Sequence, residues 1–346
     1  MLFKRFAENP LVTTADVVPS MDGFEVIGAF NAGVAERDGE VLMLLRVAER
    51  PPQVEGFVSY PVMEAGAVNV HRLPLSDPAV DVRDPRVICH KGVVYLTSIS
   101  HLRLARSRDG RSFTVDEAPT LLAEEPYEEF GIEDPRVTLI DGAYYINYSA
   151  IARTGITTVL RRTRDWRCFD RLGVVFPPDN KDVAVFPGMA GGLYWAFHRP
   201  CSGFGQLPRT WLASSPDLVN WGGHTCLLSP RPGMWDGLRI GCGSPPIRTE
   251  AGWLSLYHGA DESQRYSMGG VLLDLSDPRR VVARSDEPLL APEAPYETEG
   301  FFGGVCFACG HLLRADGSVW LYYGAADTVM AGAAAPLSGI LASLGV

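Results

Sequence analysis

The sequence has no long apolar run, and it is poor in basic residues. No window approaches the ~18 uninterrupted apolar residues of a membrane-spanning helix. The N-terminal stretch lacks the continuous apolar core of roughly 7–15 residues found in secretory signals, so we expect no such signal. Lys and Arg number 31 against 41 Asp and Glu, a net charge of −10. This balance argues against nucleic acid or an anionic membrane as a partner, and any anion site must be local.

Motifs of several common enzyme classes are also missing. The sequence has no GxxxxGK phosphate loop, no GxSxG nucleophile elbow and no HExxH zinc motif. Its seven cysteines form an odd, scattered set, which favours a reducing compartment over a disulfide framework. We therefore expect a cytoplasmic protein. The CxxC pair Cys306 and Cys309 lacks partners at zinc-ligand spacing, so we interpret it as two small residues of a strand and expect no metal.

What the sequence does contain is a repeated pattern of short strands. Residues 83–100 (RDPRVICHKGVVYLTSIS) resemble residues 133–150 (EDPRVTLIDGAYYINYSA). Each copy is followed by a second marker, SRDGRSF at Ser107 and TRDWRCF at Thr163. Looser copies begin at Asn31, Lys181, Gly243 and Val305. Units of ~50 residues with several short strands and no helical period are typical of β-propeller blades.

We therefore predict an all-β fold, a β-propeller that forms a single catalytic domain over residues 1–346. The units number five or six, depending on whether residues 51–81 belong to a blade or form an insertion. Helices should be few, with the best candidate at residues 327–344. Because the innermost strands of a propeller line its channel, equivalent positions should converge on one axial pocket. The grouped positions are Asn31, Asp84, Asp134, Lys181 and Ser244.

Asp134 is the leading candidate for a catalytic acid. An Asp-Pro-Arg sequence can equally be a simple turn whose Asp accepts local backbone hydrogen bonds, and we favour that interpretation for Asp84. Around Asp134, however, the neighbouring acids Glu128, Glu129 and Glu133 should raise its pKa by like-charge repulsion. A raised pKa is what a general acid requires.

Four basic side chains lie at or beside strand ends in separate units: Lys181, Arg199, Arg239 and His258. Each alone could be an ordinary salt-bridge partner. Together they describe a small anion pocket, and arginine forks with a lysine suit phosphate. Aromatic residues of the period-2 strands are expected in the core, although some at strand ends could stack on a sugar. They are Trp195, Trp253, Tyr257, Tyr322 and Tyr323.

The segments GIEDPR, DGAYYINYSA, NKDVAVFP, HRP, GSPPIRTEAGWLSLYHG, PYETEG and YYGAAD occur in that order. From about residue 31 to residue 327 the chain thereby resembles the mannoside phosphorylases of glycoside hydrolase family 130. The resemblance implies a five-bladed β-propeller with an axial active site. It also implies reversible, inverting phosphorolysis of a β-mannoside to α-mannose 1-phosphate, by a glycosyltransferase-type glycoside phosphorylase.

Site roles follow from the same resemblance. Asp134 would be the general acid, passing its proton to the glycosidic oxygen through a hydroxyl of the bound mannose. Phosphate would be bound by Lys181, Arg199, Arg239 and His258, with Tyr266 as a further contact. Mannose would be bound by Asn31, Arg46 and Asp327. An inverting hydrolase needs a second carboxylate to activate water, whereas phosphate is already an anion. A basic pocket opposite a single acid therefore indicates phosphorolysis.

The segment from Pro51 to Ser98, with GAFNAGVAE and LLRVAERP, looks closer to β-1,2-oligomannoside phosphorylases and related mannosyltransferase/phosphorylases. The linkage (β-1,2 or β-1,4), the acceptor and the physiological direction stay open. A β-1,2-mannosidase, a GDP-mannose-using mannosyltransferase on the same scaffold and a non-enzymatic carbohydrate-binding propeller are the alternatives. We expect no cofactor, inorganic phosphate as co-substrate, and mannose 1-phosphate and β-mannooligosaccharides as partners. Exposed blade edges commonly associate, which leaves a homo-oligomer open.

Overall fold

The structure, a computed structural model, describes residues 1–201 and 207–346. Its strands pair antiparallel in five large sheets. The first holds β2 (Glu25–Arg37), β3 (Glu40–Arg50), β9 (Ile99–Ser107) and β10 (Thr114–Val115); the second β11 (Ile132–Ile140), β12 (Ala143–Ala152), β13 (Gly155–Thr163) and β14 (Asp170–Phe176); the third β15 (Asn180–Val185), β16 (Tyr194–Pro200), β17 (Thr210–Ser215) and β18 (Gly222–Leu228). The fourth holds β19 (Arg239–Cys242), β20 (Ile247–Arg248), β21 (Trp253–Ala260), β22 (Tyr266–Leu273) and β23 (Val281–Arg284); the fifth β24 (Cys306–Leu313), β25 (Ser318–Ala325), β26 (Val329–Pro336) and β1 (Lys4–Arg5).

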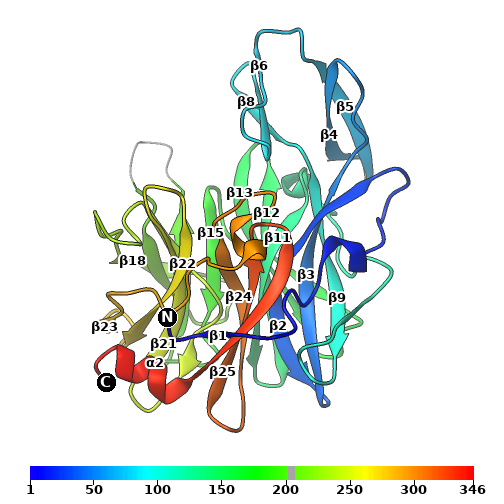
Figure 1. The fold of residues 1–346 in the computed structure, drawn as a ribbon. Helices are drawn as coiled ribbons and strands as arrows, with labels where there is room; N and C mark the ends of the chain where they lie inside the picture. The colour runs from blue at the N-terminus through cyan, green and yellow to red at the C-terminus, as the bar shows by residue number, and fades with distance from the viewer. Residues whose placement is uncertain (202–206) are drawn as a thin grey trace.

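The sheets follow one another in space as they do in sequence (Figure 1). β2 packs against β11 of the second sheet, β15 of the third sheet packs against β12 and β19, and β22 packs against β24. β24 in turn packs against β2, so the fifth sheet contacts the first. The all-β prediction is confirmed, and the division into five recurring strand units agrees with one of the two predicted unit counts.

Helical segments in the described residues are short: η1 (Thr14–Asp16), η2 (Pro126–Glu128), α1 (Pro295–Thr298) and α2 (Leu337–Ser343). The helix predicted at residues 327–344 is right only in its second half, since the first half is strand β26. The alanine-rich run of β26 is compatible with either state, and pairing with β25 decides for the strand. No helix in the described part of the chain is long and apolar enough to cross a membrane.

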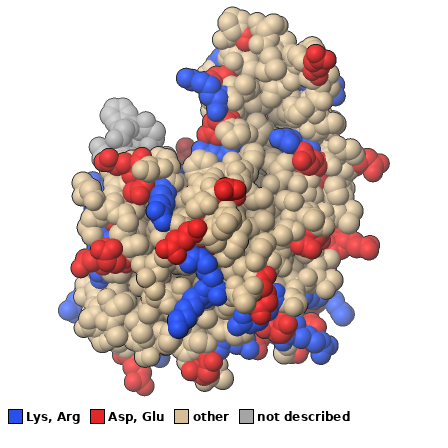
Figure 2. Space-filling view, in the orientation of Figure 1, with Lys and Arg blue, Asp and Glu red and all other residues tan. Residues whose placement is uncertain are grey.

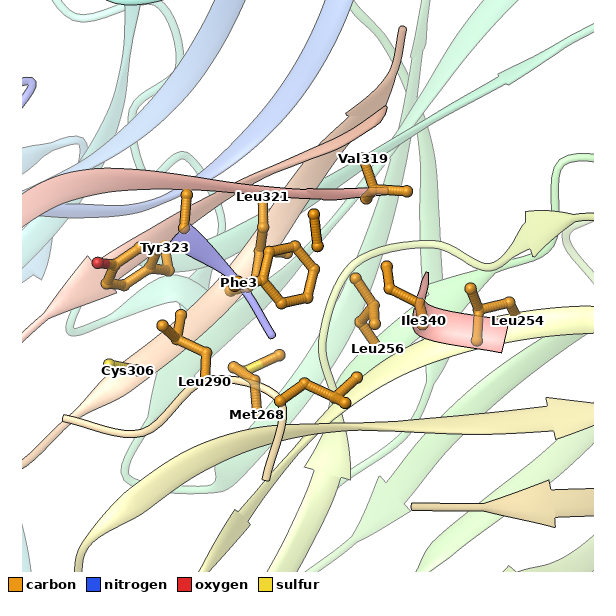
Figure 3. Close-up of a cluster of buried hydrophobic side chains, with 14 of the residues drawn as sticks. Phe3, Leu254, Leu256, Met268, Leu290, Cys306, Val319, Leu321, Tyr323 and Ile340 are labelled. Carbon is orange, nitrogen blue, oxygen red and sulfur yellow. The ribbon is translucent and has the colours of Figure 1, made fainter. Parts of the chain in front are cut away.

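The two ends of the chain meet in the fifth sheet. β1 pairs with β26, placing Lys4 opposite Ala334. Phe3 beside β1 and Ile340 of α2 then pack into one apolar cluster with Leu321 of β25 and Leu256 of β21 (Figure 3). The first residues of the chain therefore complete a sheet made by the last ones.

Residues 51–98 form an insertion between β3 and β9 rather than a sixth unit. They make a hairpin, β4 (Phe57–Glu64) and β5 (Ala67–Pro74), and a small sheet of β6 (Val80–Asp81), β7 (Val87–His90) and β8 (Val93–Leu96). Figure 1 shows both rising from one end of the molecule. The DPRV copy at Asp84 thus lies outside the five sheets, and treating it as a blade position was wrong. Its likeness to residues 133–150 reflects a shared turn-and-hairpin pattern.

The second repeated marker, in contrast, is a true structural repeat. After the third strand of the first sheet, Asp109 accepts hydrogen bonds from two backbone N–H groups in a tight turn, and Asp165 and Asp217 do the same after β13 and β17. Each turn also uses the hydroxyl two residues earlier, from Ser107 in the first sheet. Short polar side chains that replace backbone partners are what such turns need.

Two further expectations concern composition. Cys306 and Cys309 are buried thiols in β24, as the strand interpretation predicted. On the face shown in Figure 2, Lys and Arg alternate with Asp and Glu without a broad basic area. That face therefore lacks the basic surface that a polyanion such as nucleic acid needs for binding.

Candidate active site

All nine predicted site residues line one cavity of about 280 Å³. They come from all five sheets: Asn31 and Arg46 from the first, Asp134 from the second, Lys181 and Arg199 from the third, Arg239, His258 and Tyr266 from the fourth, and Asp327 from the β25–β26 turn of the fifth. The structure therefore brings together residues that are nearly 300 positions apart in sequence.

Three of the strands that line the cavity carry the same irregularity. β2, β11 and β15 each have one extra residue relative to their neighbouring strand, at Asn31, Asp134 and Asp182. These residues have φ of 50°, 50° and 53°. Asn and Asp tolerate this left-handed region better than other non-glycine residues. A bulge of this kind re-aims a side chain, which explains why short polar residues occupy these positions.

Asp134 is held by two neighbours from the first sheet. Asn31 Nδ2 donates to Asp134 Oδ1 at 2.9 Å, and Arg46 Nη1 donates to the same oxygen at 3.0 Å. Arg46 Nη2 also donates to Glu133 Oε1 at 2.7 Å. Burial alone would raise the pKa of Asp134, but Arg46, Arg136 and the Asn31 hydrogen bond hold it below its usual value.

The expected upward shift of the Asp134 pKa was therefore wrong. Glu128 turns into a buried network, where it accepts hydrogen bonds from Tyr148 at 2.9 Å and Arg171 at 3.0 Å. Glu129 pairs with Arg153 instead. Glu128 and Glu129 are close to Asp134 in sequence, but each pairs with an arginine instead. The density of acids along the sequence therefore gave the wrong direction for the Asp134 pKa.

Two other carboxyl groups of the cavity have raised pKa values. Burial raises the pKa of Glu133 even though Arg46 lies beside it. Burial also raises the pKa of Asp327 to about 6, with Asp134 adding to the shift and Arg46 opposing it. The cavity thus contains Glu133 and Asp327 beside the predicted catalytic acid Asp134.

The basic side of the cavity is built around Asp182. Arg199 Nη1 lies 2.6 Å and His258 Nε2 3.3 Å from Asp182 Oδ2, and Arg136 Nη2 donates to Oδ1 at 3.5 Å. Burial opposes ionisation of Asp182, but these neighbours hold its pKa well below the usual value. Burial lowers the pKa of His258 to about 4, so its ring is neutral at pH 7.

Some hydrogen-bonding nitrogens around Asp182 have no partner among the described residues. Lys181 lies opposite Arg199 across strands β15 and β16. Arg239 Nη1 donates to the Tyr266 hydroxyl. Arg199 Nε and His258 Nδ1 are buried and have no partner in the described residues. Both residues line the same cavity as Lys181 and Arg239, and such a set of donors is suited to binding an oxyanion.

The insertion forms part of the cavity wall in addition to the five sheets. Arg86, Val87, Leu96 and Ser98 all line it. The Arg86 guanidinium lies 4.1 Å from the centre of the Phe302 ring, and it donates to Asp84 at 3.0 and 2.8 Å. Asp84 also accepts the Arg86 backbone N–H at 2.9 Å, which confirms its interpretation as a turn residue.

Other positions grouped with the site do not belong to it. Asp84 does not line the cavity, and Ser244 is buried with its hydroxyl 2.9 Å from His311 Nδ1. The five aromatic residues expected in the core do pack there: Trp195, Trp253 and Tyr257 in one cluster, Tyr322 in a second and Tyr323 in a third. The aromatic residues that line the cavity are Phe30, Tyr266, Phe301, Phe302 and Phe307.

Sequence reasoning missed Asp182, Glu133 and Arg86 as members of the site. Asp182 directly follows Lys181 in the NKD segment, and aligning it with Asn31 and Asp134 would have required knowing the bulges. Glu133 was noticed only as a neighbour of Asp134. Arg86 lies inside a segment that was interpreted as a repeat, and its counterpart there, Arg136, is buried.

The comparisons with known proteins agree with this geometry. The model of glycoside hydrolase family 130, described as beta-1,4-mannooligosaccharide phosphorylase, matches residues 77–344. The chain belongs to glycoside hydrolase family 130. One relative, a beta-1,2-mannobiose phosphorylase from Listeria innocua, is 49% identical over 350 residues, covering 99% of this chain and 98% of the relative.

Solved structures give the same result. The complex of beta-1,2-mannobiose phosphorylase from Listeria innocua with beta-1,2-mannobiose matches with a TM-score of 0.97 and 48% identity, over 100% of this chain and 99% of that one. A second relative found by sequence, a 1,2-beta-oligomannan phosphorylase from Thermoanaerobacter sp., is 40% identical over 67% of this chain and 77% of the relative. The family that the sequence motifs resemble is confirmed, and the chain is an enzyme of that family.

Proposed function

We propose that this enzyme catalyses the reversible, inverting phosphorolysis of β-1,2-linked mannosides, giving α-mannose 1-phosphate and a shortened acceptor. Three relatives that are 49%, 40% and 38% identical to this chain are named for β-1,2 linkages, a beta-1,2-mannobiose phosphorylase among them.

For the fold, we propose that the five large sheets are the blades of a five-bladed β-propeller. Support comes from the cyclic contacts, in which each sheet meets the next and β24 of the fifth meets β2 of the first. A site built from all five sheets then lies on the propeller axis, and residues 1–346 form one catalytic domain.

The observation that carries the function is how the cavity residues divide between the sheets. The residues predicted to bind mannose, with Asp134, come from the fifth, first and second sheets, which are neighbours. The residues predicted to bind phosphate come from the third and fourth sheets. A sugar and an anion therefore have separate halves of one cavity.

This division supports attack by phosphate on the sugar face away from Asp134. Asp134 then protonates the glycosidic oxygen through a hydroxyl of the bound mannose, while Lys181, Arg199, Arg239, His258 and Tyr266 bind the phosphate. Hydrolysis would need a carboxylate free to activate water in the basic half. Asp182 is the carboxylate there, and its ion pairs with Arg199 and Arg136 make it a poor base.

The proposed reaction needs no cofactor, because phosphate itself is the nucleophile and Asp134 supplies the acid. Mannose 1-phosphate and β-mannooligosaccharides are then the other partners. On the acceptor side, Arg86 and Phe302 at the rim formed by the insertion are suited to the second sugar, since one offers charged donors and the other an aromatic face.

A substrate panel tests the proposal. The enzyme is incubated with β-1,2- or β-1,4-mannobiose, with and without phosphate, and mannose and mannose 1-phosphate are quantified. We expect mannose 1-phosphate from the β-1,2 substrate only when phosphate is present. Mannose release at the same rate without phosphate would point to a hydrolase, and transfer from GDP-mannose alone to a nucleotide-sugar transferase. Either result would overturn phosphorolysis.

A further inference from the structure

The β25–β26 turn adds a third carboxyl group to the acid half of the cavity. Asp327 lines the cavity together with Glu133 and Asp134. Arg46 bonds Glu133 at 2.7 Å and Asp134 at 3.0 Å. Asp327 has no hydrogen-bond or ion-pair partner within residues 1–201 and 207–346, although it lies in the field of Arg46. Two of the three carboxyl groups are thus bonded to one guanidinium and the third is not, and like charges in one site favour keeping a proton.

Several elements packed against the β25–β26 turn carry charged or titratable side chains. β3 contributes Arg46, the insertion contributes Arg86, and β11 contributes Glu133 and Asp134. β2 contacts the turn through Gly28, and its nearest titratable residue, Glu25, is exposed and bonded to Arg50 at 2.6 Å. The segment after α1 contacts the turn through the Phe302 N–H, and its Glu299 is exposed.

We propose that Asp327 stores the proton that Asp134 delivers to the leaving oxygen. The inference rests on the proposed phosphorolysis. Asp134 is bonded to Arg46 and Asn31, which stabilise its carboxylate, so an acid step through it requires a nearby donor to load it. Asp327 shares the cavity with Asp134 and has no cation bonded to it.

The titration behaviour of the two groups agrees with this assignment. The pKa of Asp134 is held below its usual value, whereas burial raises the pKa of Asp327 to about 6. In the free enzyme the pair therefore keeps its last proton on Asp327. Glu133 also has a raised pKa, but its oxygen is bonded to Arg46 at 2.7 Å, whereas Asp327 has no cation bonded to it in the described residues.

The proton balance closes over one cycle. The Asp327 carboxyl proton passes to the Asp134 carboxylate through a water or a sugar hydroxyl, and from Asp134 to the glycosidic oxygen as its bond to C1 breaks. An oxygen of hydrogen phosphate forms the new bond to C1. The proton that the phosphate carried leaves as the sugar phosphate becomes a dianion, and it returns to Asp327.

The test is the pH dependence of kcat/KM for β-1,2-mannobiose at saturating phosphate, for the wild type, D327N, D327E and E133Q. Asn keeps the left-handed backbone at position 327, where φ is 50°, so D327N preserves the turn. Removing the store should move the alkaline limb of the profile down by about one pH unit or more, because Asp134 alone loses its proton earlier. The loss in D327N should then be at least about tenfold greater at pH 7 than at pH 5.

Restoring a carboxyl in D327E should return the limb towards its wild-type position, and E133Q should move the limb less than D327N does, because Glu133 is the smallest of the named influences on Asp327. A D327N enzyme that loses the same factor at every pH would show that Asp327 only contacts the sugar. A limb that moves in E133Q but stays in D327N would place the proton on Glu133. Both results would overturn the proposal.

A second measurement does not depend on turnover. Infrared titration of the free enzyme should show the carbonyl band of a protonated carboxyl near pH 6 in the wild type and E133Q, and should lack it in D327N. A band that persists in D327N would contradict the proposal. Failure of phosphorolysis itself is recognised separately, since the wild type would then release no mannose 1-phosphate at any pH.

Discussion

Arg199 Nη1 lies 2.6 Å from Asp182 Oδ2, and both side chains are almost fully buried. A buried carboxylate is stable only when its charge is matched, and Arg136 supplies the second positive charge while the neutral His258 ring lies 3.3 Å away. Asp182 therefore fixes the shape of the basic half of the cavity without needing to touch the substrate.

Replacing Asp182 with Asn should destabilise the protein and weaken phosphate binding together. Removal of one partner from a buried ion pair costs about 3–5 kcal/mol, because the remaining cations lose their counter-charge. Thermal unfolding and the KM for phosphate measure the two effects. Asp170→Asn is the control, since the Arg162–Asp170 pair is exposed and worth at most about 1 kcal/mol. Equal losses in both variants would contradict the prediction.

Asp134→Asn should abolish turnover while preserving the fold. Loss of a general acid typically lowers kcat by about 10²–10⁴-fold, and Asn can still keep the left-handed backbone. Asp84→Asn is the matched variant, because it changes the same residue type in the same Asp-Pro-Arg context. There we expect kcat within a few-fold of wild type and a higher KM for the mannoside. Similar kcat losses in both variants would show that the two positions are not functionally distinct.

Arg86→Ala should weaken binding of the acceptor sugar and leave phosphate binding unchanged. The substitution removes a charged donor that Asp84 and the Phe302 ring hold at the rim of the cavity. A charge-assisted hydrogen bond contributes about 1.5–3 kcal/mol, so the KM for mannose in the synthetic direction should rise by at least about tenfold.

Phe302→Leu separates the two supports of Arg86, because it removes the aromatic face but keeps the ion pair. We expect a smaller rise in the acceptor KM, since a cation–π contact contributes about 0.5–2 kcal/mol. An Arg86→Ala enzyme with a raised KM for phosphate and an unchanged KM for mannose would contradict the prediction. It would show that Arg86 contributes to phosphate binding and not to acceptor binding.

Acid should destabilise the fold through its buried histidines. Burial, helped by Arg103, lowers the pKa of His101 from 6.5 to about 3. The unfolded chain therefore binds a proton that the folded chain refuses, and stability present above pH 6.5 is lost as the pH falls towards 3. The slope is roughly 1.4 kcal/mol for each pH unit in this window. Unfolding by denaturant at several pH values should show a shallower slope in His101→Gln, and an unchanged slope would refute the argument.

The sequence predicted the residues of the site better than their electrostatics. Asn31, Asp134 and Lys181 could be grouped because strand repeats and family motifs mark them. Asp84 was grouped with them wrongly, since a local Asp-Pro-Arg turn has the same letters inside or outside a large sheet. The pKa of Asp134 could not be read from nearby glutamates either, because Glu128 and Glu129 are bonded to arginines that are distant in sequence. Distances in space, rather than along the chain, decide a pKa.

The pairing of β1 with β26 also bears on how the protein is made. Lys4 leaves the ribosome early, but its partner Ala334 is added some 330 residues later. At about 5–20 residues per second, the outer edge of the fifth sheet waits for tens of seconds before it can form. Until then β1 has no partner strand, because β26 has not yet been synthesised. Unpaired strand edges tend to pair with other chains. Completion of the fifth sheet is therefore a late step of folding, because it joins two strands that lie some 330 residues apart.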